Sequence, residues 1–244
     1  MSNKEHYLHK VYWLWLPLLM FSTIVICGMT NYQAYDHYFN GELGIIELAT
    51  PLVLFPAIIF GIVIFSDNKK VLDKNIKYCV LIITLACVYM AGEELNWGQH
   101  LWGWETPQWL MGANDQRETN LHNISSWFDQ KTRLLLEIFV LVCGIFMPLY
   151  RMITGNDFQT YDWRYWLLPT ETCLPVSILI ILSKVPERIK EIFDLPTTVF
   201  AIPNAYETMK MVREFRYSEI QELFFAIFLA LYLMSIRNRQ KLSS

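Results

Sequence analysis

Residues 92–123 read GEELNWGQHLWGWETPQWLMGANDQRETNLHN and stand between two long apolar runs, 78–92 and 134–150. The segment contains four glutamates, two histidines and four tryptophans. The apolar runs on either side predict membrane helices. A plain connection between two such helices needs none of these polar side chains, so the segment is where a function is expected.

Composition places the whole chain in the membrane. Of its 244 residues 54% are hydrophobic and 15% aromatic, and several apolar stretches approach the length of about twenty residues that spans a bilayer. We therefore predict an all-α fold, a single integral membrane domain over 1–244 built as a polytopic transmembrane helical bundle. The formal net charge of −3 provides no basic surface, which excludes nucleic acid as a partner.

Six apolar runs are expected to form the membrane helices: 11–29, 43–65, 78–92, 134–150, 165–182 and 220–236. Pro51 and Pro56 are expected to kink the second helix, because proline removes a backbone donor. The first run is followed by polar residues rather than a small-residue cleavage site, so we interpret it as a retained helix. The five cysteines lie inside apolar runs without paired spacing and are expected to be packing residues.

Lysine and arginine gather at alternate connections: at positions 4 and 10, in 69–77, at 151 and 164, and in 237–241. The positive-inside rule places these segments in the cytoplasm. Both termini are then cytoplasmic in a bacterial inner membrane, and 92–133 lies at the outer face. Segment 183–219 falls on the outer side as well and has six basic residues interleaved with acids, which weakens the asymmetry.

This topology places carboxylates from separate helices at one membrane depth: Glu47, Glu93, Glu94, Glu137, Glu219 and Glu222. Charged groups at such a depth are costly unless they are paired, hydrated or bound to a cation, so they indicate a functional site. The alternative is a set of helix-end charges that are favoured by the helix dipole.

Glutamate and histidine spacing within the central segment favours a metal site. Glu118 and His122 are four residues apart and share one face of a helix, and Glu94 with His100 supplies a second pair. Carboxylate and imidazole ligands suit a divalent transition metal such as zinc, iron or manganese. We expect these four residues to bind the metal and Glu93 to act as general base. The alternative is a hydrogen-bond network that folds an interfacial loop.

The tryptophans at 97, 102, 104, 109 and 127 are expected to form a belt at the headgroup level, with an apolar wall for an acyl chain or a sugar as the alternative. Short interfacial helices are expected at 107–111, at 114–123 and within 183–219 on the outer side. Glu171, inside the fifth apolar run, is interpreted as an ion-path or proton-relay carboxylate or as a group bonded to a neighbouring helix.

The pattern Gly92-Glu93-Glu94-x-x-Trp97-Gly98-Gln99, then Thr106-Pro107, then Asn114-x-Gln116-x-Glu118-x-Asn120-Leu121-His122-Asn123, resembles the signature of a broad group of uncharacterised bacterial polytopic membrane proteins. The resemblance covers residues 92–123 and implies a shared site without an assigned activity. Alkaline-ceramidase-like hydrolases are a poor match, because the chain lacks their closely spaced histidine pair in a late helix.

Two classes of function follow. The first is a metal-dependent hydrolase or transferase that acts at the outer leaflet on a lipid or lipid-linked substrate. The alternative is a non-catalytic membrane protein, either a cation or proton carrier or a subunit that docks a partner. The sequence does not decide whether the protein is an enzyme. It contains no Gly-x-Ser-x-Gly elbow, Walker loop or dinucleotide fingerprint, which leaves no basis for a serine hydrolase or a nucleotide-driven protein.

Overall fold

The computed structural model describes residues 8–40, 44–67, 71–108, 119, 126–155, 158–192 and 216–243. Within these residues the chain is helical and contains no strand, which confirms the predicted all-α class. The elements are η2 (Val11–Trp15), α1 (Leu16–Thr30), α2 (Tyr32–Tyr38), α3 (Ile45–Ser66), α4 (Lys74–Glu94), η3 (Asn96–Gly98), α5 (Gln99–Trp102), α7 (Ser126–Phe139), η5 (Val140–Phe146), α8 (Met147–Thr154), α9 (Trp163–Leu167), η6 (Glu171–Cys173), α10 (Leu174–Ile192) and α12 (Tyr217–Leu242).

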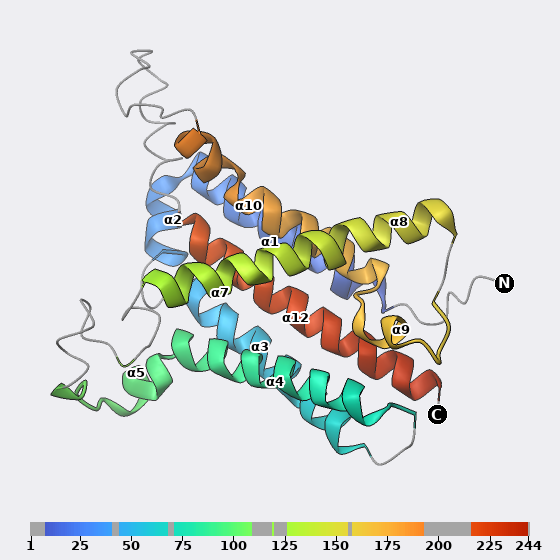
Figure 1. Cartoon of the computed structure of the whole chain (residues 1–244). Helices are drawn as coiled ribbons and strands as arrows, with labels where there is room; N and C mark the ends of the chain where they lie inside the picture. The colour runs from blue at the N-terminus through green and yellow to red at the C-terminus, as the bar shows by residue number, and fades with distance from the viewer. Residues whose placement is uncertain are drawn as a thin grey trace.

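Six helical stretches in this described part are long and apolar enough to cross a membrane: Val11–Thr30, Ile45–Ser66, Lys74–Glu94, Gln130–Thr154, Trp163–Ile189 and Tyr217–Leu242. Successive stretches run in alternating directions, so η2 begins at the end of the bundle where α12 finishes (Figure 1). The predicted number of spans is confirmed. Which end faces the cytoplasm stays a prediction.

Helix α12 forms the centre of the bundle (Figure 1). It packs along α3 and α10, and 83% of its membrane-spanning window is buried, against 17% for the first span. Phe228 and Tyr232 stack with ring centroids 6.2 Å apart, and Phe139 meets both rings edge-on. The most apolar span is α3, with a mean hydropathy of 2.5 against 1.7 for α12. Lipid is as apolar as a protein core, so hydropathy does not determine which helix becomes central.

Small residues allow neighbouring helices to approach closely. A Cβ added at Gly61 in α3 would lie 1.9 Å from the Thr84 hydroxyl oxygen of α4, and one at Gly144 would lie 2.4 Å from the Ser177 hydroxyl oxygen of α10. Both hydroxyls donate to the backbone carbonyl four residues earlier, that of Val80 in α4 and that of Cys173 in η6, so neither hydroxyl proton is unpaired at the contact. Such contacts are typical of helix association in membranes.

The fifth span differs from its prediction as one continuous helix over 165–182. It consists of α9, an extended residue at Leu168, then η6 and α10. Leu168 has φ −87° and ψ 138°, the extended conformation that a following proline favours, and residue 169 is proline. Helix α10 continues to Ile192, so residues 183–192 belong to this helix rather than to an interfacial connection. Proline is tolerated inside helices of a bundle, and α3 runs without a break through Pro51 and Pro56.

Several predicted features fall outside the described residues. These are nearly all of the interfacial helices at 107–111 and 114–123, and the connection over 193–215.

Candidate functional site

Carboxylates from three spans meet at one end of the bundle. Glu47 lies in the first turn of α3, Glu94 is the last residue of α4, and Glu219 and Glu222 lie in the first turns of α12. Glu94 is within electrostatic range of the other three. The predicted grouping of acids from separate helices is therefore found for these four residues. Their end of the bundle is called the acidic end.

Two arginines contact these carboxylates. Arg133 of α7 pairs with Glu222 at 2.6 Å between nitrogen and oxygen. Arg216, which precedes α12, pairs with Glu219 and lies 3.5 Å from Glu47. If all six groups are charged, the carboxylates exceed the arginines in this part of the described chain. Excess negative charge beside lipid is costly, and a bound cation or proton reduces that cost.

A second network lies beside the first. Glu137, one turn after Arg133 on α7, is buried, accepts a hydrogen bond of 2.8 Å from the Gln221 amide of α12 and pairs with Arg188 of α10. The sequence interpretation found Glu137 but missed its partners. It also missed both arginines of the first network, although the Arg133–Glu137 spacing of four residues is a usable signal.

Tyr35 of α2 is fully buried beside Arg216 and Glu219. Burial raises the pKa of this phenol to about 12, so it stays protonated in the physiological pH range. Helix α2 thus covers the start of α12 with a neutral polar group.

A tight turn follows α4. Asn96, Trp97 and Gly98 have φ values of 46°, 53° and 95°, the left-handed region that costs energy for residues other than glycine. The turn brings the Trp97 ring over Gly92, where an added Cβ would lie 2.9 Å from the ring. The Trp97 indole donates to the Glu93 carboxylate at 2.6 Å. Glu93 is buried in this contact, whereas its neighbour Glu94 interacts electrostatically with the other three carboxylates.

Gln99 holds the next part of the central segment together. Its amide nitrogen donates to the Thr106 hydroxyl at 2.9 Å, and its amide oxygen accepts from the Thr119 backbone at 2.6 Å. The Trp104 indole also donates to the Thr119 hydroxyl. Gln99 and Thr106 therefore match the hydrogen-bond network that was the alternative to a metal site. Trp102 stacks on Trp104 at 5.8 Å and is 72% exposed, as expected of an interfacial belt.

The predicted metal set is described in part. Glu94 belongs to the acidic end. His100 lies in α5, and its side chain is not among the described parts of the structure. Glu118 and His122 lie outside the described residues. Among the residues that are described, no three histidine, cysteine or acidic side chains are placed to hold a metal ion. All five cysteines have free thiols, as predicted.

Glu171 lies in η6 at the opposite end of the bundle, 3.9 Å from Arg151 of α8. This ion pair joins Glu171 to a neighbouring helix, and its role as an ion-path or proton-relay carboxylate stays a prediction. Between the two ends, α12 is apolar from Leu223 to Leu231 and nearly all of it is buried.

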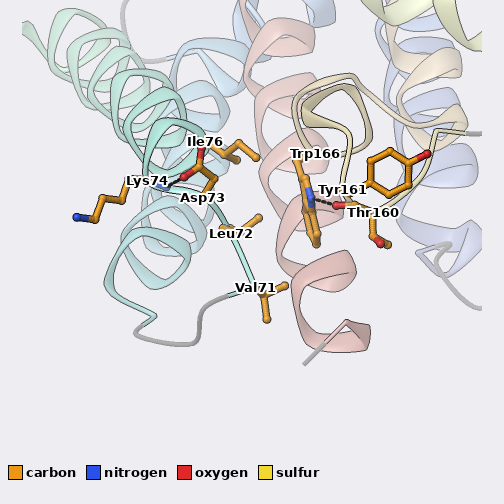
Figure 2. Close-up of a pocket in the computed structure, with 8 residues that line it drawn as sticks. All are labelled: Val71, Leu72, Asp73, Lys74, Ile76, Thr160, Tyr161 and Trp166. Atoms are coloured by element: carbon orange, nitrogen blue, oxygen red, sulfur yellow. Dashed lines mark hydrogen bonds between the residues drawn. The ribbon is translucent and has the colours of Figure 1, made fainter.

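A pocket of about 500 Å³ also lies away from the acidic end, between the start of α4 and α9 (Figure 2). Its lining is mainly apolar, with Leu72 and Ile76 facing Trp166. The Trp166 indole donates to the Thr160 carbonyl, and Asp73 accepts from the first backbone amide of α4. These polar groups serve the fold, so the pocket offers no catalytic set.

Comparisons with protein-family models, with curated proteins and with solved structures give no match to this chain, so the site is interpreted from its own geometry.

Proposed function

We propose that the acidic end is the centre of a metal-dependent membrane hydrolase or transferase that acts on a lipid or lipid-linked substrate. One observation carries the proposal: Glu47, Glu94, Glu219 and Glu222 gather from three spans, and among the described residues two arginines pair with them. Carboxylates gathered at the ends of membrane helices favour a bound cation.

In this proposal Glu94 is one metal ligand, and His100, Glu118 and His122 complete the set. A divalent ion of zinc, iron or manganese would polarise the substrate and activate a water molecule. Glu93 would supply the general base for that chemistry. The hydrogen bond from Trp97 fixes the orientation of the Glu93 carboxylate.

A lipid substrate is supported by the position of the site. The carboxylates lie at the ends of membrane-spanning helices, and the side chains of Glu47 and Glu222 are partly exposed. The exposed Trp102–Trp104 pair follows the same end of α4, and tryptophan favours the headgroup level. A lipid headgroup at this level would lie near the carboxylates.

The apolar middle of α12 favours this proposal over a carrier. A carrier needs polar groups from one face of the membrane to the other, whereas the central helix is apolar from Leu223 to Leu231. Glu171 pairs with Arg151 beyond that stretch. We also propose, from the signature in 92–123, that the chain belongs to the bacterial group named above. The distribution of lysine and arginine supports an inner-membrane location with both termini in the cytoplasm.

Metal content tests the proposal. Protein extracted from membranes without chelators is expected to contain about one equivalent of a transition metal. Glu94→Gln and His122→Ala should each lower metal affinity by about tenfold or more. Glu187→Gln is the matched control, because Glu187 pairs with Lys184 on α10.

A second measurement addresses catalysis. Lipid extracts from cells that overproduce the wild-type protein should show a converted lipid species by mass spectrometry, and Glu93→Gln should retain metal but lose the conversion. A wild-type protein without metal, or a conversion that persists after chelation, would falsify the metal-dependent enzyme.

A further inference from the structure

The pocket between α4 and α9 lies where two membrane spans begin. Its lining comes from the start of α4, which begins at Lys74, and from residues just before and within α9, which begins at Trp163. Both helices open spans of the bundle, Lys74–Glu94 and Trp163–Ile189. A pocket at the end of a membrane span lies at the level where phospholipid headgroups meet acyl chains. Phospholipids are therefore the molecules present at its mouth.

The walls of the pocket are apolar and held in place. Leu72 and Ile76 are buried on the α4 side and face the ring of Trp166 (Figure 2). The Trp166 indole donates to the Thr160 carbonyl at 2.8 Å, and the Trp166 carbonyl accepts from Arg239. Because the indole nitrogen is already bonded, the ring presents an apolar surface to the pocket. Such walls offer water few hydrogen-bond partners and favour an apolar occupant.

The size and the rim of the pocket suit part of a lipid molecule. Its volume of about 500 Å³ falls within the range of ligand pockets, about 300 to 1,000 Å³. Two exposed side chains lie at its edge: Tyr161 is 89% exposed, and Lys74 extends away from Trp166 (Figure 2). A lysine at a span end keeps its ammonium group at the headgroup level through its long apolar stem. The pocket thus combines an apolar interior with a positive charge at its edge.

Basic residues outnumber acidic ones at this end of the bundle. The basic residues that the structure describes here are Lys10, Lys74, Lys77, Arg151, Arg164, Arg237, Arg239 and Lys241, and the acidic ones are Asp67, Asp73, Asp162 and Glu171. Three of the acids pair with arginines of the same end, and Asp73 accepts from the Lys74 backbone amide and caps α4. The excess of positive charge favours an anionic lipid over a neutral one.

We propose that this pocket binds an anionic phospholipid of the bilayer, with part of an acyl chain between Leu72, Ile76 and Trp166 and the headgroup phosphate beside Lys74. The bound lipid fills the space between α4 and α9 and joins the two helices. This site lies at the opposite end of the bundle from the acidic end, so it goes beyond the proposed function and does not depend on it.

Binding of short-chain lipids to the purified, delipidated full-length protein tests the inference by native mass spectrometry. Dihexanoyl phosphatidylglycerol is expected to bind at least about fivefold more tightly than dihexanoyl phosphatidylcholine, because its headgroup has a net negative charge. Glycerol phosphate, which has no acyl chain to fill the pocket, should bind at least about tenfold more weakly than the phosphatidylglycerol. Equal affinity of the two lipids, or of phosphatidylglycerol and glycerol phosphate, overturns the inference.

A charge reversal locates the headgroup. Lys74→Glu should lower the affinity for phosphatidylglycerol by about fivefold or more and leave that for phosphatidylcholine nearly unchanged. Glutamate in the first turn of a helix is favoured by the helix dipole, so α4 is expected to form in this variant. The matched control is Lys10→Glu, which reverses another exposed lysine at the same end and should bind as the wild type does. Unchanged phosphatidylglycerol affinity in Lys74→Glu, or an equal loss in Lys10→Glu, overturns the inference.

A bulkier side chain tests the acyl-chain part of the site. Val71→Trp places a large ring in the lining of the pocket and should lower the affinity for both lipids. Its control is Val63→Trp, an exposed position on α3 that does not line the pocket and should leave both affinities unchanged. A folded Val71→Trp protein that binds both lipids as the wild type does overturns the inference. If this variant does not fold, the Lys74→Glu result decides.

Discussion

Helix α12 carries charged residues at both of its ends, and the two ends differ in how those charges are neutralised. At its C-terminal end Arg239 is 3% exposed and donates to the backbone carbonyls of Tyr165 and Trp166 and to Ser235. Its guanidinium also lies 5.4 Å from the centre of the Tyr165 ring. At the acidic end, carboxylates outnumber the arginines that contact them in the described chain, and buried acceptor atoms lack donors.

The difference has a local cause at the Arg239 end. The break before Pro169 ends α9 after five residues and leaves its last carbonyls without helical partners. Arg239 and the Tyr232 hydroxyl, which donates to the Leu167 carbonyl at 2.6 Å, supply the missing donors. At this end Arg239 and the backbone carbonyls satisfy one another, whereas at the acidic end buried oxygens of Glu219 and Gln221 have no hydrogen-bond partner among the described residues. Substitutions at the two ends should therefore have opposite effects on stability.

The largest effect is expected for Arg239→Met. The substitution keeps the apolar length of the side chain but leaves two buried carbonyls unpaired, which should lower the free energy of unfolding by about 3 kcal/mol. Denaturant titration in micelles measures the change. The control is Arg164→Met, which removes the more exposed pair with Asp162 and should lower the free energy of unfolding much less, because solvent screens an exposed ion pair. Equal losses in the free energy of unfolding for the two variants would contradict the conclusion that the contacts of Arg239 stabilise this end of the bundle.

A smaller effect is expected from alkaline pH through Tyr35. Its pKa is about 12 in the folded protein, against about 10 in an unfolded chain. The raised pKa contributes stability that is complete below pH 10 and is lost as the pH rises through 12, a change of about 1 to 2 kcal/mol. Melting temperature should therefore fall less steeply over this range in Tyr35→Phe. Tyr161→Phe, which alters an exposed phenol, should follow the wild-type curve.

The smallest effect has the opposite sign. Glu94→Gln removes a carboxyl group that lies near three other carboxylates, and it keeps the shape of the side chain. In the absence of ligand, the free energy of unfolding should rise by about 0.5 to 1 kcal/mol, the usual result when a functional site is relieved of strain. Glu187→Gln should give no such gain, because it removes a favourable contact with Lys184. A lower free energy of unfolding in Glu94→Gln than in the wild type would indicate that contacts within the protein stabilise the acidic end, as they stabilise the Arg239 end.

The number and type of the helices were predictable because runs of about twenty apolar residues have few other structures available to them. The central place of α12 was not predicted, since its hydropathy is unremarkable, but Gln221, Tyr232, Ser235 and Arg239 inside one span were a usable signal. Polar groups at such depth need protein partners around them. Pro169 likewise indicated the break in the fifth span, which the apolar pattern obscured.

The sequence predicted at which end of the bundle the carboxylates gather, but it did not predict their ion pairs. Alternating spans bring Glu47, Glu94, Glu219 and Glu222 to one end, whatever the rotation of each helix. Contacts with Arg133, Arg216 and Arg188 depend on those rotations, which the sequence does not provide. The Glu93–Trp97 contact could be predicted from the sequence, because a spacing of four residues at a helix end brings two side chains together. The metal-ligand set stays a prediction, since Glu118 and His122 lie outside the described residues.

The position of α12 has a consequence for biosynthesis. The helix around which the others pack is the last of the six spans to leave the ribosome, so the earlier spans enter the bilayer before their common partner exists. Until it arrives, Glu47 and Glu94 have neither Arg216 nor the rest of α12 beside them. Nascent chains arrested before residue 217 are therefore expected to remain loosely associated and to be degraded rapidly by membrane proteases.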